Sequence, residues 1–246
     1  MEGIGSRFEQ ETGYSRRGEP GRGPRPLTRA PAHKVYPEAP RLALPAPEVA
    51  GGPGLWTLLQ ARRSLRAYDG QPIPAAAVGQ LLWASTGATR QAGATMLRTA
   101  PSAGALYPIE TYLAVHSVED VSPGLYHYAM REHALEQLAA GDYRAAVAAA
   151  ALDQEMAAQA NLVLIWSAIF ARTTIKYSQR GYRYVYLDAG HVAQNAALAA
   201  VALGLGSCQI AALYDDEANA LLGLDGQSES VIYMTAVGRP PQRGLR

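Results

Sequence analysis

The sequence Ala61-Arg-Arg-Ser-Leu-Arg-Ala-Tyr-Asp69 places three arginines and a serine within five residues. The whole chain has 22 Lys and Arg against 21 Asp and Glu, so this concentration of positive charge is local. Guanidinium groups donate paired N–H groups to phosphate oxygens, and a serine hydroxyl adds a further donor. The segment therefore predicts a phosphate cradle. An exposed basic helix end is the alternative that these residues leave open.

Composition limits the class of protein. The 246 residues, 48% hydrophobic, suffice for one sizeable core, and a net charge of +1 gives no general attraction for nucleic acid or an anionic membrane. The one cysteine, Cys208, excludes intrachain disulfides and a multi-cysteine zinc site. No basic start precedes an apolar run, and no apolar stretch reaches about 18 residues. We expect a cytoplasmic protein with no membrane span and no resident metal ion.

The first 53 residues differ in composition from the rest. They are rich in Gly, Pro and Arg, which argues against any helix or central strand there. They also carry Tyr36, Leu44 and Val49, and such apolar residues favour contact with a folded surface. We predict an extended N-terminal arm over residues 1–53 and one folded domain over residues 54–246.

Apolar spacing in the folded domain predicts helices that alternate with strands, which indicates an α+β fold. The helix over 188–203 consists mostly of alanine, so we expect it to be buried on all faces and covered partly by a second copy of the chain. A buried helix of a monomer is the alternative. The predicted helices are 55–63, 74–86, 142–160 and 188–203, and the predicted strands are 110–116, 124–128, 161–168 and 231–237.

Two further segments contain glycine turns at which a flat ligand could approach the backbone. Pro101-Ser-Ala-Gly-Ala-Leu-Tyr-Pro108 leads into a predicted strand, and Ala202-Leu-Gly-Leu-Gly-Ser-Cys-Gln-Ile-Ala-Ala212 turns from a helix into an extended stretch. An ordinary loop and an ordinary helix-to-strand connection are the alternatives. The dinucleotide motif Gly-x-Gly-x-x-Gly after a strand and the P-loop motif are both missing from the sequence, so side chains would have to hold a phosphate.

Four motifs together resemble the FMN-dependent nitroreductase family, and within it the SagB/ThcOx-type dehydrogenases of azole-containing peptide biosynthesis. The resemblance covers roughly residues 35–240. It implies a nitroreductase-like three-layer α+β sandwich, an intertwined homodimer, and FMN at the subunit interface. The motifs are, in order, Arg62-Arg-Ser-x-Arg-x-Tyr68, Pro101-Ser-Ala-Gly-x-Leu-Tyr-Pro108, Tyr182-Arg-Tyr with Asp188-Ala-Gly-His-x-x-Gln-Asn195, and Leu203-Gly-Leu-Gly-Ser-Cys208.

The resemblance also implies roles for single residues. The first motif would hold the FMN phosphate and ribityl, the Pro-Ser segment would lie near the flavin from the partner subunit, and the segment after Gly-Leu-Gly would run along the isoalloxazine ring. Family members place a basic residue near the C-terminus, for which we prefer Arg239 over Arg243. The implied cofactor-binding residues are Arg62, Arg63, Ser64, Arg66, Pro101, Ser102, Ala103, Gly104, Leu106, Gln209, Ile210, Ala211, Ala212 and Arg239.

One segment departs from the family pattern. Many relatives carry a proline and a glycine-containing pair after the Gly-Leu-Gly turn, where this chain has Gln209-Ile-Ala-Ala212. Side-chain contacts to flavin N5 cannot be carried over to these positions. Hydrogen bonds from the backbone N–H groups of this segment to the flavin would remain possible, because they do not depend on the side chains.

Lys176 and Tyr177 are the predicted catalytic residues, because the azoline dehydrogenases that the chain resembles carry a Lys-Tyr pair ahead of the Tyr-Arg-Tyr segment. Oxidising an azoline to an azole removes a carbon-bound proton and a hydride, so it requires a base. Burial or a neighbouring cation, such as Arg172 or Arg180, would move a lysine toward useful basicity. An exposed Lys-Tyr pair is the alternative. We expect His191 to be a hydrogen-bonded structural residue.

The expected activity is FMN-dependent dehydrogenation of an azoline-like heterocycle in a peptide or small molecule. An NAD(P)H-dependent nitroreductase or flavin reductase is the first alternative, because one open cleft can serve both reactions. A flavin-binding scaffold subunit of a biosynthetic complex is the second. In that case the arm would dock the partner, and deleting residues 1–50 would cost partner binding while FMN stayed bound. Loops such as Ser85–Thr99 would shape the cleft for a substrate that the sequence does not name.

Overall fold

A seven-stranded antiparallel sheet forms the centre of the molecule. The computed structural model describes residues 3–14, 16, 25–93 and 95–241. The strand order is β1-β6-β5-β4-β7-β9-β8. The strands are β1 (Arg41–Ala43), β4 (Ile109–Val115), β5 (Gly124–Ala129), β6 (Ala134–Ala140), β7 (Leu162–Ile169), β8 (Gly206–Ile210) and β9 (Glu229–Gly238).

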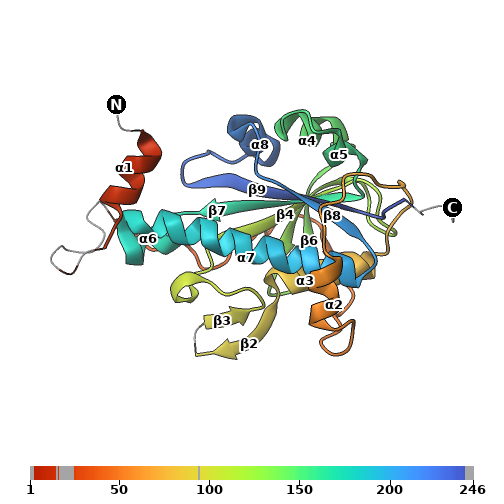
Figure 1. Ribbon diagram of the computed structural model, residues 1–246, viewed down its shortest axis with the longest axis horizontal. Helices are drawn as coiled ribbons and strands as arrows, with labels where there is room; N and C mark the ends of the chain where they lie inside the picture. The colour runs from red at the N-terminus through yellow and green to blue at the C-terminus, as the bar shows by residue number, and fades with distance from the viewer. Residues whose placement is uncertain (1–2, 15, 17–24, 94, 242–246) are drawn as a thin grey trace.

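Helices cover both faces of this sheet (Figure 1). Strand β7 shows why, because its apolar residues alternate: Leu164 and Trp166 pack with α3 and α7, whereas Val163 and Ile165 pack with α4, α5 and α8. The predicted three-layer α+β sandwich is confirmed. The covering helices are α3 (Ala75–Thr86) and α7 (Gly181–Ala202) on one face, and α4 (Arg144–Ala150), α5 (Glu155–Gln159) and α8 (Asp215–Leu222) on the other.

Smaller elements lie around these layers. The segment between α3 and β4 contains a separate two-stranded sheet, so the expected loop at 85–99 is largely a hairpin. The elements are α1 (Ile4–Glu11), α2 (Leu55–Ala61), β2 (Ala88–Ala92), β3 (Thr95–Arg98), α6 (Ala171–Tyr177) and 3-10 turns over Ala103–Ala105 and Ser178–Arg180.

Three secondary-structure predictions need correction. The single helix expected over 142–160 is two helices, because Leu152 and Asp153 both adopt a φ of 56° and interrupt it. Helix α7 begins at Gly181, before the expected start at residue 188. A helix also forms at α1, where the arm composition argued against one. Residues 4–11 contain a single glycine and no proline, so the proline density that prevents helix formation starts only further along the chain.

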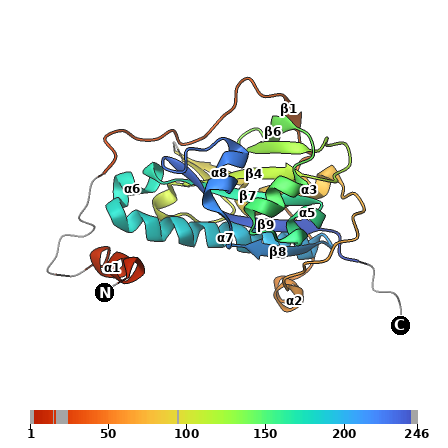
Figure 2. The same ribbon diagram turned by 90° about the horizontal axis from the view of Figure 1, so that it is seen from above.

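The N-terminal arm runs from the α6 end of the molecule to the far edge of the sheet (Figure 2). At its start, Arg172 in α6 donates from Nε to the carbonyl of Pro31 at 2.7 Å. At its end, β1 pairs with β6, where Leu42 lies opposite Leu135. The arm therefore adds an edge strand to the sheet. The domain boundary at residue 53 stays a prediction.

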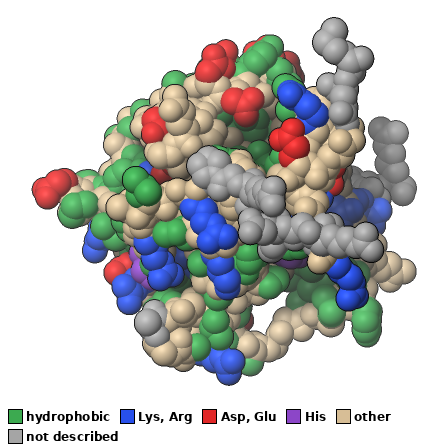
Figure 3. Space-filling model, turned by 90° about the vertical axis from the view of Figure 1, so that its left-hand side faces the viewer, with side chains coloured by type: hydrophobic (Ala, Val, Ile, Leu, Met, Phe, Trp, Pro, Cys, Tyr) green, Lys and Arg blue, Asp and Glu red, His purple; other side chains and the backbone are tan. Residues whose placement is uncertain are grey.

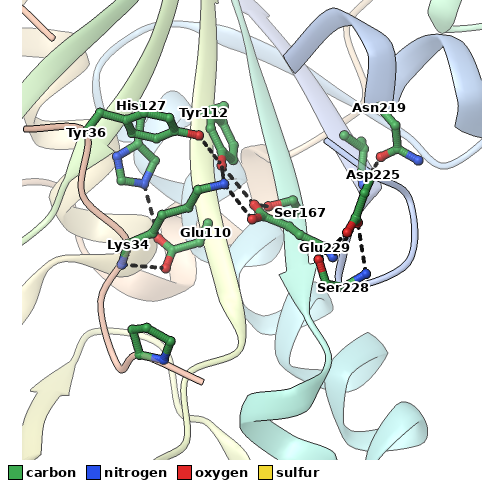
Figure 4. A network of polar contacts seen from close by, with 12 residues as sticks. Lys34, Tyr36, Glu110, Tyr112, His127, Ser167, Asn219, Asp225, Ser228 and Glu229 are labelled. Atoms are coloured by element: carbon green, nitrogen blue, oxygen red, sulfur yellow. Dashed lines mark hydrogen bonds and ion pairs between the residues drawn. The ribbon is translucent and has the colours of Figure 1, made fainter. Parts of the chain in front are cut away.

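Buried carboxylates fasten the arm to the sheet, as Figure 4 shows. The Lys34 ammonium donates to a Glu229 carboxylate oxygen at 2.6 Å, and its backbone N–H donates to Glu110 at 3.3 Å. Arg41 pairs with Glu136, whose side chain is fully buried, at 2.7 Å. Each of these three carboxylates thus has a partner in the arm, and each would be left less compensated without it.

Glu110 has two further partners in the body of the protein. The Arg172 guanidinium lies 2.6 Å from one carboxylate oxygen, and His127 lies 3.3 Å from the other. Burial alone would raise the pKa of Glu110, but the hydrogen bond with His127 and the charge of Arg172 lower it to about 2. The carboxylate therefore stays ionised beneath the arm.

His116 makes the stability depend on pH. Burial lowers the pKa of His116 from 6.5 to about 4, although its ring nitrogen lies 3.1 Å from the carbonyl of Ala160. A group whose pKa is lower in the folded protein than in the unfolded protein binds its proton more readily in the unfolded protein. Its contribution to stability is therefore complete above the unfolded-state pKa and is lost as the pH falls toward the folded-state pKa. We expect the free energy of unfolding to drop by up to about 3 kcal/mol between pH 6.5 and 4, and less in His116→Gln. Urea unfolding at pH 6.5 and pH 4 measures this free energy. An equal drop between the two pH values in the parent protein and in His116→Gln would contradict the prediction.

Candidate functional site

The predicted phosphate cradle lies at the edge of the sheet beside β8. Helix α2 ends at Ala61, and the chain then runs alongside the outer strand, with Leu65 donating its N–H to the Ser207 carbonyl at 2.9 Å. Gly206 permits this approach, because a Cβ there would lie 2.9 Å from Leu65 Cδ1. The local structure thus displays the arginine cluster, defined as Arg62, Arg63, Ser64 and Arg66, at an open sheet edge.

The charges of this cluster are not neutralised. Within the described part of the chain, no carboxylate forms an ion pair with Arg62, Arg63 or Arg66. Arg63 and Arg66 are exposed, and Arg62 is half-buried. Three uncompensated guanidinium groups in five residues favour binding of a multiply charged anion.

The outer edge of β8 continues this surface. Since the Ser207 carbonyl points outward to Leu65, strand alternation directs the backbone N–H and carbonyl of Gln209 to the same edge. Ile210, by contrast, buries its side chain in the core. Ala211 and Ala212 are exposed. Contacts from this segment to a ligand at the edge would therefore come chiefly from the backbone and from Gln209.

Arg239 lies at the same edge. Its carbonyl accepts the N–H of Asp69 at 3.0 Å, and its own N–H donates to the Asn161 side chain at 2.9 Å. The guanidinium donates to the Pro72 carbonyl at 3.0 Å. The structure thus brings together the first motif, the segment after Gly-Leu-Gly and Arg239, which are far apart in sequence.

A large groove opens next to this edge. It has a volume of about 1110 Å³ and lies between α2, α3 and the C-terminal half of α7, with Arg239 in its wall. Gln80, Trp83 and Asn195 supply polar atoms, and most of the other lining residues are apolar. Such a lining suits a ligand or a protein segment that is largely apolar.

The other predicted residues meet at the opposite end of α7. Gly104 adopts a φ of 64°, and a Cβ on it would lie 2.7 Å from the Tyr177 hydroxyl and 2.8 Å from Lys176 Nζ. The predicted catalytic pair therefore lies directly against the Pro-Ser-Ala-Gly turn. Lys176 is exposed, Tyr177 is half-buried, and the ammonium lies 5.1 Å from the Tyr177 ring centroid.

The backbone at this end is strained. Besides Gly104, three residues with side chains have positive φ: Ala105 (54°), Tyr107 (48°) and Ser178 (52°). Each such residue costs on the order of 1–2 kcal/mol. Strain of this kind persists only where surrounding contacts hold it, and it is commonly found at functional sites.

Gly104→Ala is expected to displace the catalytic pair. The new methyl group would overlap Lys176 Nζ and the Tyr177 hydroxyl, which are the movable ends of long side chains, and φ would be unfavourable by about 1–2 kcal/mol. We expect a small loss of thermal stability and a large loss of turnover. Gly93→Ala, also at a positive φ but with open space around it, is the matched control. Equal activity losses in the two variants would contradict this prediction.

The two expected neighbouring cations are both engaged elsewhere. Arg172 is buried and pairs with Glu110 at 2.6 Å. Arg180 stacks on the Tyr184 ring, at 5.6 Å from the centroid, and donates to its hydroxyl. The positive charge of Arg172, one of the two cations that the sequence argument offered as neighbours of Lys176, is thus compensated by Glu110.

Helix α1 is held on this same end. Arg183 donates from Nε to the Thr12 hydroxyl at 2.7 Å and forms an ion pair with Glu9, and Arg180 donates to the Thr12 carbonyl at 2.9 Å. Figure 3 views this end and shows Lys and Arg side chains gathered among hydrophobic ones. Guanidinium groups thus cap the C-terminal end of α1, next to the catalytic pair.

Asp188 contacts the predicted site, although the sequence argument gave it no role. It is buried on α7 and accepts hydrogen bonds from the Ser102 hydroxyl and the Ala103 N–H. A carboxylate among the Ala, Gly and Val residues of this helix was the available signal. Buried charges need hydrogen-bonding partners, so such a residue predicts a specific contact.

Helix α7 separates the two halves of the predicted site. Helix α2, which the arginine cluster follows in sequence, lies near the C-terminal end of α7, and α6, which contains Lys176, lies near its N-terminal end, in both Figure 1 and Figure 2. A helix of 22 residues is about 33 Å long. One copy of the chain therefore does not bring Arg62 and Lys176 to a single ligand.

The helix also leaves one face uncovered in the single chain. Leu187 is 61% exposed, and Gly190, His191 and Gln194 on the same stripe are exposed too. In the single chain this stripe, which includes His191, is exposed because it lies on the face that the core does not reach. Its expected cover by a second copy and the structural role of His191 stay predictions.

Two absences concern only the residues that the structure describes. They include no group of three or more His, Cys, Asp or Glu side chains arranged to hold a metal ion. None of their helices combines the length and apolar character of a membrane span.

The structure has a sheet between two helix layers, with the uncompensated arginine cluster at the edge of the sheet. A strained turn lies over a Lys-Tyr pair. These features are formed by the motifs that resemble one family. Residues 59–239 match the model of the Nitroreductase family. The chain belongs to the nitroreductase family, and it is therefore an oxidoreductase of a flavin-binding type. The family resemblance inferred from the sequence is confirmed.

Three relatives define its position further. MJ1384 of Methanocaldococcus jannaschii, whose name assigns it to the nitroreductases, is 38% identical over 178 residues, which are 72% of this chain and 87% of MJ1384. The trifolitoxin-processing protein TfxB of Rhizobium leguminosarum bv. trifolii is 30% identical over 60% of this chain and 41% of TfxB. A chain of the Escherichia coli microcin synthetase McbBCD complex with truncated pro-MccB17 bound has a TM-score of 0.63 and 25% identity, over 75% of this chain and 73% of that chain.

Proposed function

We propose that the protein is an FMN-dependent dehydrogenase of SagB/ThcOx type, which oxidises an azoline-like heterocycle in a peptide or small molecule. The observation that carries the proposal is the placement of Lys176 and Tyr177 against the Gly104 turn. The relatives support it, because TfxB is named for processing trifolitoxin and the McbBCD complex holds truncated pro-MccB17. We also place the enzyme in the cytoplasm.

The residues at the sheet edge fit FMN. Its phosphate carries up to two negative charges, and the cluster offers three guanidinium groups with no internal carboxylate partner. Gln209 presents backbone groups beside that cluster, where the polar edge of a flavin ring needs hydrogen bonds. Arg239 adds positive charge at the same edge. When bound, FMN supplies the chemistry of accepting a hydride.

A homodimer explains how both halves of the site reach one ligand. A twofold axis near the middle of α7 would run the two copies of this helix antiparallel. The exposed stripe around Gly190 supplies the contact surface. This arrangement carries Lys176 of one copy toward the arginine cluster of the other, so each FMN would contact Pro101, Ser102, Ala103, Gly104 and Leu106 of the second copy.

The catalytic pair provides the proton chemistry. The substrate ring loses one carbon-bound hydrogen as a proton and another as a hydride, and the ring becomes aromatic. Lys176 accepts the proton at its Nζ. The Tyr177 hydroxyl, next to it over Gly104, donates a hydrogen bond to the substrate.

A second candidate is an NAD(P)H-dependent nitroreductase or flavin reductase. The 38% identity to MJ1384 favours it. In that reaction the arginine cluster and the groove keep their roles, while Lys176 has no proton to remove from a ring carbon. The two functions therefore differ in which reductant delivers hydride and in whether Lys176 is needed.

The visible spectrum tests both candidates. We expect purified protein to carry a flavin absorbance, or to acquire one with FMN, and we expect an azoline-containing peptide to bleach it under anaerobic conditions. Bleaching by NADH or NADPH alone would favour the second candidate. A protein that does not bind FMN would overturn both.

A further inference from the structure

Asp188 is tied to the turn that faces the catalytic pair. Its side chain is buried, with 4% exposed. One carboxylate oxygen accepts the Ser102 hydroxyl at 2.5 Å, and the other accepts the Ala103 N–H at 3.2 Å. The Ser102 oxygen in turn accepts the Tyr107 N–H at 2.9 Å. Asp188 thus anchors both ends of the segment from 102 to 107 through a closed set of hydrogen bonds.

The anchored segment has an unfavourable backbone conformation. Gly104, Ala105 and Tyr107 all have positive φ, between 48° and 64°. A chain released from its anchors would leave that region. The bonds to Asp188 therefore maintain the one shape in which Gly104 presents its bare Cα to Lys176 and Tyr177.

The surroundings of the carboxylate exclude a ligand-binding role. Asp188, Ser102, Arg98 and Tyr107 share a cavity of about 10 Å³, which is at the lower limit for one water molecule. Among the residues that the structure places, none forms an ion pair with Asp188. Burial raises the pKa of this carboxyl, although hydrogen bonds from Ser102 and Ala103 oppose the shift. A buried carboxylate that accepts hydrogen bonds from Ser102 and Ala103, and has no ion-pair partner among the described residues, serves the turn.

We propose that Asp188 is a positioning residue, which holds the Ser102–Gly104 turn against Lys176 and Tyr177 and so fixes where these two side chains stand. Its importance for turnover rests on the proposed function. The effect of Asp188 on the position of Lys176 does not depend on the proposed function, and it can be measured separately.

The chain has two lysines, Lys34 and Lys176, which makes that measurement selective. Lys34, in the arm, forms an ion pair with Glu229, whereas Lys176 is exposed. We would treat the full-length protein with an amine-reactive reagent and follow both sites by peptide mass spectrometry. In Asp188→Asn the amide nitrogen meets the Ser102 oxygen as a donor, so the hydroxyl loses its acceptor. We expect the labelling rate at Lys176, relative to Lys34, to rise at least threefold in Asp188→Asn and in Ser102→Ala. The double variant should show no larger rise than either single variant.

Asp153→Asn is the matched control, because it makes the same change at an exposed residue on the other side of the sheet. It should leave the ratio unchanged. Should Asp188→Asn fail to fold, Ser102→Ala removes the same bond with a smaller change. An unchanged ratio in Ser102→Ala and in folded Asp188→Asn would overturn the positioning role.

The kinetic measurement separates this inference from the proposed function. With saturating FMN and an azoline peptide as reductant, we expect Asp188→Asn to lower kcat 10- to 100-fold, with KM for the peptide within threefold of the parent. A changed labelling ratio with a parent enzyme that no azoline peptide reduces would support the positioning role and overturn the proposed function. A kcat of Asp188→Asn within threefold of the parent at saturating FMN, in a parent enzyme that the azoline peptide reduces, would overturn the positioning role.

Discussion

Lys176→Ala is expected to slow azoline-driven flavin reduction by roughly 10²- to 10⁴-fold, the usual contribution of a general base. Lys176 lies at the open end of α6, with its ammonium against the Gly104 turn and no ion pair in the described part of the chain. Removing its side chain therefore takes away the base without breaking an ion pair of the described residues. Stopped-flow absorbance of FMN-loaded protein under anaerobic conditions measures the rate, and the flavin spectrum before mixing reports whether the cofactor is retained.

Lys176→Arg is the informative comparison. A guanidinium keeps the positive charge and most of the length of the side chain but stays protonated, so it cannot accept the proton. We expect it to be as slow as Lys176→Ala. If Lys176→Arg retains near-parental rates, the lysine contributes charge or shape instead of basicity, and the catalytic assignment fails. If NADPH bleaches the flavin of both variants at the parental rate, the nitroreductase hypothesis gains support.

Lys34→Ala is expected to lower the free energy of unfolding by about 3 kcal/mol, because breaking a buried ion pair leaves the remaining charge without its partner. The Glu229 carboxylate would keep only the hydroxyls of Tyr112 and Ser167 as donors, at 2.8 and 2.5 Å. Arg29→Ala is the matched control, since Arg29 is an exposed cation of the same arm. Its change should lie within about 0.5 kcal/mol. Urea unfolding measures both, and equal effects would contradict the prediction.

This prediction also bears on the scaffold hypothesis. Deleting residues 1–50 was expected to remove a docking arm and leave the flavin bound. With Lys34 and Arg41 paired to carboxylates inside the protein, the same deletion is expected to destabilise the fold and reduce FMN binding with it. A stable, FMN-binding deletion variant would restore the arm as a free docking segment.

The sequence predicted the layers of the fold because local patterns determine them. The continuous apolar run of β7 is buried on both of its faces, and Ala189, Ala193, Ala196 and Ala200 of α7 lie in the core. The break between α4 and α5 was missed, since no glycine or proline marks the positive φ values at Leu152 and Asp153. A break of this kind leaves no signal in the local composition.

The candidate site was predictable to a different degree at its two ends. The arginine cluster is contiguous in sequence, so its charge could be read directly from residues 62–66. The assembly of Gly104 with Lys176 depends on contacts across more than 70 residues, and only the family resemblance suggested it. The pairing of Arg172 with Glu110 could not be foreseen, because a buried ion pair leaves no periodic signal.

The contacts of the arm set the order in which the molecule can mature during synthesis. Lys34 leaves the ribosome early, but its partner Glu229 lies 195 residues later, on the strand β9 near the end of the described chain. Closing so long a loop is slow and must wait for that strand to be made. The arm around Lys34 is therefore among the last parts of the described chain to be fixed, and until then Glu110 and Glu136 on the sheet lack their partners in the arm.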